Sequence, residues 1–345
     1  MHQLQHIPLL NSIWFVLVGI LLTGYAILDG FDFGVGILHL FVKKDEDRRI
    51  LLNSIGPVWD GNEVWLVTGG GALFAAFPGA YATVFSGFYN AFMLLLVALI
   101  FRAVSIEFRS KEPSFAWRQS WDIAFSSASF LAALLIGVTM GNITRGIHLD
   151  SQGDYVGSFI DLLNPYSLLL GVTVVALFAM HGSIFLVLKT EGELQSTIKG
   201  WVPRLIAIFL VLFLCFNAAT FFECPDLVAT MIKRPYGFAV LALDIAAAIS
   251  IGLMVKRGYE FGAFLMSSLT MVLLMAVLGI SYFPNIVMSM PDPAYSLTIT
   301  NCSSSHKTLG YMFIIACIGV PIVLAYTVSI YWIFRGKTRL GHVGY

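Results

Sequence analysis

The stretch that decides the fold is SIWFVLVGILLTGYAILDGFDFGVGILHL (12–40), which holds no Lys or Arg and only two acids, Asp29 and Asp32. A helix needs about 20 mostly apolar residues to span a bilayer. The stretch exceeds that length, so a helix over it must tilt or protrude. No basic segment precedes it, and its apolar part is longer than the core of a signal peptide. We therefore interpret it as a first membrane span.

The composition of the whole chain agrees with this interpretation. Of 345 residues, 58% are hydrophobic and 12% are charged, and the mean hydropathy is +0.84. Soluble proteins carry about 25% charged residues, which they need to cover their surface. Lys+Arg and Asp+Glu are equal at 20 each, so no net charge favours an anionic partner such as nucleic acid. A soluble enzyme, a disordered chain and a nucleic-acid-binding protein are excluded.

Apolar runs of spanning length recur along the chain and predict an all-α, polytopic membrane protein with about nine helices in bundles. We expect one integral-membrane domain over 1–345, without internal repeats. The predicted spans are 12–40, 53–77, 80–101, 121–144, 164–188, 203–222, 236–255, 260–284 and 309–334.

The distribution of basic residues predicts the orientation of these spans. If the N-terminus is periplasmic, sixteen of the twenty Lys and Arg residues lie at the cytoplasmic side and four at the outer side. Cytoplasmic segments of membrane proteins carry the excess of Lys and Arg. We therefore expect a periplasmic N-terminus and a cytoplasmic C-terminus.

Two neighbouring spans each carry a pair of acids. Asp29 and Asp32 lie about 60° apart on the first helix, with Tyr25 and His39 on the same side. The second span contains WDGNEVW (59–65), in which Asp60 and Glu63 have the same spacing. At about 1.5 Å per residue, Asp32 and Asp60 lie roughly 12–13 Å from the cytoplasmic ends, and Asp29 and Glu63 roughly 17–18 Å. The two pairs are therefore expected at matching depths.

Acids inside a membrane span are costly and often functional. Each costs about 2.5–3.5 kcal/mol at a helix centre on insertion scales, and such residues often mark ion or proton paths. The two pairs favour a ladder of proton-exchanging carboxylates that opens to the cytoplasm. A purely structural network is the alternative, in which Asp29 pairs with Arg102 or with unwound, Gly-rich backbone.

Neither the histidines nor the cysteines indicate a metal or haem site in this chain alone. Among the histidines, only His39 and His181 fall in predicted spans, and their depths differ by roughly 10 Å, whereas a bis-His haem needs two ligands at one depth. Cys224 and Cys302 fall in outer loops, where either a disulfide or two free thiols is possible. The sequence lacks CxxC, HExxH, P-loop and GxSxG motifs.

Several runs resemble subunit II of cytochrome bd-type quinol oxidases, and together they extend over nearly the whole chain. The WDGN run is the most specific of these matches. The matching runs are GYAILDGFDFGVG (24–36), GPVWDGNEVWLVTGGGALFAAFPGAYA (56–82), SGFYNAFMLLLVALIFRAVSIEFRSK (86–111), LLNPYSLLLGV (162–172), SSLTMVLLMAVLGISYFP (267–284) and GVPIVLAYTVSIYWIF (319–334).

The resemblance implies a non-haem subunit of a respiratory enzyme of the bacterial inner membrane that oxidises quinol and reduces dioxygen to water. It implies a heterodimer in which the larger partner, subunit I, holds two b-type haems and one d-type haem. Small accessory single-span subunits and a structural quinone or lipid are compatible with it. This chain would support subunit I and supply part of a cytoplasmic proton path.

The resemblance also implies roles for individual residues. It assigns the proton path to Asp29 and Asp60, with Asp32 and Glu63 beside them. Arg102 and Glu107 are expected either at the inner mouth of the path or as an exposed surface pair. The residues expected to surround the path are Trp59, Asn62, Trp65, Tyr25 and His39.

A proton-coupled secondary transporter is the alternative function, because it also places acids at mid-membrane beside Gly-rich helices. Transporters of this kind show corresponding broken helices in two halves. Here the second half has no counterpart to Asp29 or Asp60, and Asp244 is its single acid well inside a late span. A purely structural subunit that stabilises a haem partner is a third interpretation.

Overall fold

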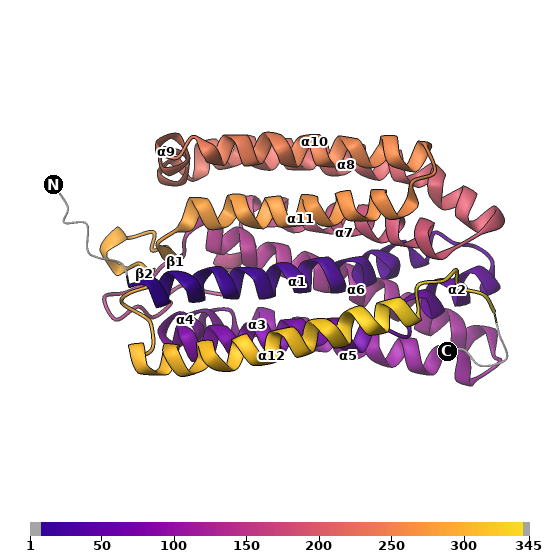
Figure 1. Cartoon of the computed structure of the whole chain (residues 1–345), viewed down its shortest axis with the longest axis horizontal. Coiled ribbons are helices and arrows are strands. Elements are labelled where there is room, and N and C mark those ends of the chain that lie inside the picture. Colours follow the sequence, from indigo (N-terminus) through magenta and orange to yellow (C-terminus); the bar gives the residue numbers. More distant parts are fainter. Residues whose placement is uncertain (1–7, 341–345) are drawn as a thin grey trace.

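The computed structural model describes residues 8–340, which form an elongated bundle whose long helices run along one axis (Figure 1). The α-helices are α1 (Leu9–His39), α2 (Asp45–Ile55), α3 (Trp59–Ala76), α4 (Pro78–Gly87), α5 (Tyr89–Phe108), α6 (Phe115–Arg145), α7 (Pro165–Lys189), α8 (Gly192–Glu223), α9 (Pro225–Lys233), α10 (Tyr236–Lys256), α11 (Glu260–Tyr282) and α12 (His306–Ile333). The remaining elements are three short 3₁₀ helices (Arg109–Lys111, Ile160–Leu163 and Pro293–Tyr295) and the antiparallel strands β1 (Asn285–Val287) and β2 (Leu297–Thr298).

The helices form successive layers across the bundle. In Figure 1, α8 and α10 lie along one edge, followed by α7 and α11, then α1 and α6, and finally α3, α5 and α12 along the other edge. α1 packs against α3, α6 and α7, and α7 packs against α6, α8 and α11. These contacts place α1 and α7 at the centre, and α7 is the most buried of the long apolar helices in residues 8–340.

The prediction of an all-α membrane protein is confirmed. Within residues 8–340, eight helices are long and apolar enough to span a membrane: α1, α5, α6, α7, α8, α10, α11 and α12. α3 has 18 residues and is not among them, because Asp60 and Glu63 lie in its first two turns. The start of α1 and the end of α12 lie at opposite ends of the bundle (Figure 1). Which end faces the cytoplasm stays a prediction.

Several predicted spans have boundaries that differ from those of the helices: the third, 80–101, is divided between α4 and α5, and prolines lie beside the helix breaks before α3 and α4. The second span was expected to begin at residue 53, but α2 ends at Ile55 and α3 begins at Trp59. Pro57 lies between them and cannot continue a helix, since it has no N–H and its ring clashes with the preceding turn. Pro78 likewise starts α4, because the residue before a proline is pushed out of the helical region.

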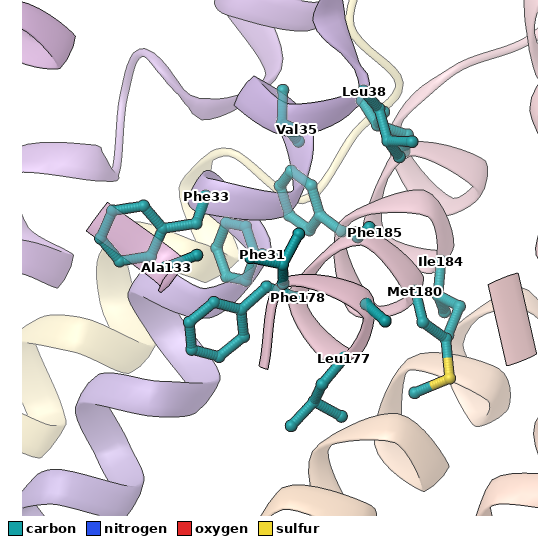
Figure 2. Close-up of a cluster of buried hydrophobic side chains, with 14 of the residues drawn as sticks. Phe31, Phe33, Val35, Leu38, Ala133, Leu177, Phe178, Met180, Ile184 and Phe185 are labelled. Carbon is teal, nitrogen blue, oxygen red and sulfur yellow. The ribbon is translucent and has the colours of Figure 1, made fainter. Parts of the chain in front are cut away.

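Aromatic side chains fill the contact between α1 and α7. Phe31 stacks on Phe185 with ring centroids 4.0 Å apart, and Phe33 stacks on Phe178 at 5.7 Å. Figure 2 shows these rings with the aliphatic side chains around them. The contact fixes the rotation of α1, which positions Asp29 and Asp32.

α1 and α7 cross most closely where Gly34 meets Gly182. A Cβ atom added at Gly34 would lie 1.9 Å from the Phe178 carbonyl oxygen and 2.8 Å from Gly182. We therefore expect Gly34→Ala to destabilise the protein by about 1–3 kcal/mol, the usual cost of overpacking. The measurement is thermal unfolding of the purified protein in detergent. Gly19→Ala on the same helix is the control, because a Cβ there meets nothing within 4 Å. If Gly34→Ala and the wild type had equal melting temperatures, α1 and α7 could move apart at this crossing without loss of stability.

Candidate functional site

One arginine and three acids from three helices meet inside the bundle. Arg102 of α5 binds Asp29 of α1 through both terminal nitrogens, and its Nη1 also donates to Glu63 of α3 at 2.8 Å. Asp32 lies 3.8 Å from Arg102 Nη2. A guanidinium can bind carboxylates in this forked manner, which fixes geometry as well as charge. We call these four residues the acid–arginine cluster.

The acid–arginine cluster is almost completely buried. The side chains of Arg102, Asp29 and Asp32 are 0% exposed, whereas that of Glu63 is 23% exposed. The guanidinium also lies over the ring of Phe33, 4.3 Å from its centroid, an arrangement that favours a cation. Glu63 is therefore the acid through which the cluster reaches the surface of this chain.

A chain of hydrogen bonds connects Asp32 to the last helix. The Asn62 amide nitrogen donates to Asp32 Oδ2 at 2.7 Å and to the Leu28 carbonyl oxygen at 3.1 Å. The Tyr331 hydroxyl of α12 donates to the Asn62 amide oxygen at 2.8 Å. Asp32 Oδ1 has no hydrogen-bond partner within residues 8–340. The site thus has contributions from α1, α3, α5 and α12.

A large groove runs along the surface between α3 and α12. Its volume is about 820 Å³, and we call it the α3–α12 groove. The polar residues that line it include Asp60, Asn62, Glu107 and Tyr331. Asp60 is exposed on this surface. The groove therefore brings an exposed acid, Asp60, to the same lining as Asn62, which contacts Asp32 of the acid–arginine cluster.

The structure separates residues that the sequence was expected to group. Asp60 lies in the first turn of α3 and makes no contact with Arg102, so the two acid pairs do not form one four-membered ladder. Arg102 is neither at an inner mouth nor in a surface pair, because it is buried against Asp29. The contact between Arg102 and Asp29 is the pairing that the sequence analysis gave as an alternative. Glu107 is half-buried and lines the groove.

The aromatic residues expected around the path occupy different positions. The Tyr25 hydroxyl is buried one turn before Asp29 and has no hydrogen-bond partner in the described part of the chain. The Trp65 ring packs over Gly24, where a Cβ atom would lie 2.4 Å from it. Trp59 lines the groove beside Asp60. These positions are compatible with a supporting role around the acids.

His39 belongs to a second buried charge network, away from the acid–arginine cluster. Its Nε2 lies 2.5 Å from Asp122 of α6, and Arg109 Nε also donates to Asp122 at 2.5 Å. Arg48 donates to the same carboxylate at 3.0 Å. The network ties the adjoining ends of α1, α2, α5 and α6 together. The expectation that His39 surrounds the acid path is therefore not met by its contacts.

Comparisons with known proteins show what kind of chain holds this site. A family model described as cytochrome bd terminal oxidase subunit II matches residues 10–334. The chain is 36% identical to cytochrome bd-I ubiquinol oxidase subunit 2 of Escherichia coli (strain K12), over 95% of each chain. It is also 36% identical to cytochrome bd ubiquinol oxidase subunit 2 of Bacillus subtilis (strain 168), over 95% of this chain and 96% of that one.

The chain belongs to the cytochrome bd terminal oxidase subunit II family. Its fold is similar to that of a chain in the bd oxidase of Geobacillus thermodenitrificans, with a TM-score of 0.78 at 17% identity. That match covers 94% of this chain and 98% of the other. As a subunit II with eight apolar helices, the protein is a multi-pass component of an oxidoreductase complex in the bacterial inner membrane.

Of the two buried histidines, His181 has both ring nitrogens hydrogen-bonded, whereas His39 has a partner at Nε2 and none at Nδ1 within residues 8–340. His181 Nδ1 lies 2.8 Å from Ser267 Oγ, and its Nε2 lies 3.0 Å from the Ile27 carbonyl oxygen. The His39 Nε2 is within hydrogen-bond distance of Asp122 Oδ1. A haem iron needs a free ring nitrogen aimed at it. Within residues 8–340 no group of three or more His, Cys, Asp or Glu residues could hold a metal ion.

Cys224 and Cys302 of this subunit II are free thiols in separate clusters. Cys224 packs with Tyr166 and Leu227, whereas Cys302 packs with the end of α3. Burial raises the pKa of the Cys302 thiol to about 11 and also raises the pKa of the Cys224 thiol. The free-thiol alternative is therefore the one that the structure has, and neither thiol is reactive at neutral pH.

Family membership does not favour the transporter interpretation, and Asp244 gives it no support. Asp244 of α10 is 1% exposed, and neither carboxylate oxygen has a hydrogen-bond partner among the described residues. The acid–arginine cluster is formed by α1, α3 and α5, and α10 contributes nothing to it. A second acidic half-site of the kind that a transporter needs is therefore not assembled in residues 8–340.

Three functional-site residues could not be identified from sequence. Asn62 and Arg102 were named, but the contact of Asn62 with Asp32 and that of Arg102 with Glu63 were not. Tyr331, Phe33 and Asp122 were not named at all, because an aromatic or an acid near the end of a span is common. Asp122 could have been found from one signal, since an acid close to Arg109 and Arg118 at a predicted inner end indicates an ion pair.

Proposed function

We propose that this subunit II carries part of the cytoplasmic proton path of a quinol oxidase that reduces dioxygen to water. The observation that supports the proposal is the buried acid–arginine cluster. Reduction of dioxygen to water consumes protons at a site that bulk water does not reach freely. Taking those protons from the cytoplasm, while quinol is oxidised near the outer side, separates charge across the membrane.

The charge balance of the acid–arginine cluster supports proton storage. Asp29, Asp32 and Glu63 would carry three negative charges if all were ionised, against the single positive charge of Arg102. An uncompensated buried carboxylate is costly by several kcal/mol. Protons on some of these carboxyl groups remove that cost, and the groups share them over short distances. The cluster is therefore a place where protons can be held and exchanged.

The α3–α12 groove supports an entry route to this cluster. Asp60 and Glu107 line the groove, and Glu63 is the acid of the cluster whose side chain is partly exposed. Ordered water can bridge such groups and carry protons between them. We infer that protons pass from Asp60 and Glu107 to Glu63, and from there to Asp29 and Asp32.

The same face supports docking of the haem-bearing subunit I. An acid such as Asp60 would be costly against lipid. Gly61, Gly70 and Gly71 of α3 and Gly319 of α12 have nothing within 4 Å of a built Cβ atom, so this chain does not use them for its own packing. Small residues on a membrane helix allow another helix to approach closely. We infer that helices of subunit I cover the groove and complete the proton path.

The haems belong to subunit I in this proposal, as the family resemblance implies, and both ring nitrogens of the buried His181 are already hydrogen-bonded. Within the complex, the haems supply the electron transfer and oxygen binding. The residues of this chain hold and move protons at the carboxyl oxygens described above. The accessory single-span subunits and a structural quinone or lipid stay predictions.

The test of the proposed function is Asp60→Asn in the assembled complex. A positioned proton donor contributes about 10²–10⁴-fold to a rate, so we expect oxygen consumption with quinol to fall at least about tenfold. Haem spectra and subunit ratio should stay unchanged, because Asp60 makes no contact that holds the chain together. The control is Glu112→Gln, which removes an exposed acid just beyond α5. Wild-type turnover in a haem-replete Asp60→Asn complex would remove this residue from the path.

A further inference from the structure

α12 is attached to the rest of the chain mainly at its two ends. Near its start, the Trp14 indole nitrogen donates to the Leu309 carbonyl oxygen at 3.0 Å, and Leu309 is the one buried residue of this helix. Near its end, Tyr331 contacts Asn62 and the edge of the Phe31 ring. The α3–α12 groove lies between these two attachments. The position of Tyr331 therefore depends on how α12 is seated.

The Tyr331 hydroxyl adds a hydrogen bond that helps to hold the Asn62 side chain in one orientation. The Leu28 carbonyl oxygen can only accept a hydrogen bond, so the amide nitrogen of Asn62 must face α1. The amide oxygen then faces α12, where the Tyr331 hydroxyl donates to it. In the opposite orientation, the amide oxygen would face the Leu28 oxygen and the Asp32 carboxylate. The hydrogen bond from Tyr331 thus stabilises one of two amide orientations.

The orientation of Asn62 affects Asp32 directly. The amide nitrogen lies 2.7 Å from Asp32 Oδ2, whereas the nearest nitrogen of Arg102 is 3.8 Å away. A donor at hydrogen-bond distance stabilises the charged form of a carboxylate more than its neutral form. Asp32 Oδ1 has no partner in the described chain. Asn62 is consequently the nearest side-chain donor to Asp32 among residues 8–340.

We propose that Tyr331 is a positioning residue for proton transfer, which it controls by orienting Asn62 toward Asp32. Tyr331 comes from α12, which lines the face on which subunit I docks. Docking of subunit I therefore stabilises the position of Tyr331, and through Asn62 it orients a hydrogen-bond donor toward Asp32 for proton exchange. The inference rests on the proposed function of the acid–arginine cluster. It adds a named residue through which docking regulates that cluster.

The test uses Tyr331→Phe in the purified complex, since this change removes the hydroxyl and keeps the ring. We expect intact subunit ratio and haem content, and proton uptake in a single turnover about two- to tenfold slower, the effect of one lost hydrogen bond. Infrared difference spectra should show a stronger carboxylic acid C=O band, which disappears when Asp32→Asn is added. A purely structural role would not change that band.

The matched control is Tyr236→Phe. Tyr236 lies on α10, away from the α3–α12 groove, is 57% exposed and makes no side-chain hydrogen bond within residues 8–340. We expect wild-type rates and spectra for this variant. If Tyr331→Phe gives the same result as the control, the inference is wrong.

A double variant tests whether Tyr331 acts through Asn62. Tyr331→Phe combined with Asn62→Ala should be no slower than Asn62→Ala alone, because the amide that Tyr331 orients is gone. Additive slowing would overturn the inference. Failure of the proposed function looks different: the Asp60→Asn and Asp29→Asn complexes would then turn over normally, while the infrared change in Tyr331→Phe would persist.

Discussion

Replacing Arg102 with leucine should prevent stable assembly of the complex. The change leaves Asp29, Asp32 and Glu63 together in the protein interior without their shared cation. Breaking a buried ion pair by removing one partner costs about 3–5 kcal/mol, a large part of the stability of a typical domain. We expect little purified complex and a lower melting temperature for what is recovered. Size-exclusion profiles and thermal unfolding in detergent measure both.

Two further variants show whether charge is the cause. Arg204→Leu removes an exposed arginine from α8 and should have little effect. Arg102→Leu combined with Asp29→Asn removes the two most closely paired charges together, so we expect part of the lost stability to return. An Arg102→Leu complex that melts like the wild type would show that the acids do not depend on this arginine.

The membrane fold and the acids of the site could be predicted because their signals are local. Apolar runs define spans, and spacing along a helix places Asp29 and Asp32 on one side. The pairing of Asp29 with Arg102 could be proposed as an alternative, since Asp29 lies within a predicted span and Arg102 at the inner end of another. Which alternative holds depends on how α1 and α5 rotate against each other, and that is set by packing such as the contact of Phe33 with Phe178.

The sequence could not predict that Asp60 and Glu63, the acid pair of α3, have different surroundings. Residues three apart on a helix differ by about 60° in direction. That difference accompanies the contact of Glu63 with Arg102 and the position of Asp60 in the lining of the groove. Pro57 also moves the start of the helix to Trp59, which changes the depth expected for Asp60. The pattern of acids alone contains neither fact.

Contacts between distant parts of the chain also could not be predicted from the sequence. Tyr331 and Asn62 are 269 residues apart, and His39 and Asp122 are 83 apart. A single sequence gives the faces of helices but not which faces meet. His39 falls on the side of Asp29 by spacing, yet it lies beyond the acid–arginine cluster along α1 and meets α6 instead. Long-range partners of polar residues therefore come from the structure.

Asp29→Asn should leave the complex intact and slow its proton uptake. The amide keeps the shape of the side chain and can still accept a hydrogen bond from Arg102, whose charge stays balanced by Glu63 and Asp32. An amide cannot take up and release a proton as a carboxyl group does. We expect proton uptake in a single turnover with dioxygen to slow about 10²-fold, the lower end of what a positioned acid or base contributes. A pH-indicating dye in stopped-flow measurements reports that rate.

Asp244→Asn provides the matched control for this variant. It also removes a buried acid from a membrane helix, but Asp244 lies in α10 and has no hydrogen-bond partner among residues 8–340. If the loss of any buried acid slows the enzyme, both variants will be slow. If proton transfer runs through the acid–arginine cluster, only Asp29→Asn will be slow, and electron transfer to the haems before proton uptake will be unchanged in both. Unaltered proton uptake in Asp29→Asn would leave the cluster with a structural role, in which Arg102 serves to hold α1, α3 and α5 together.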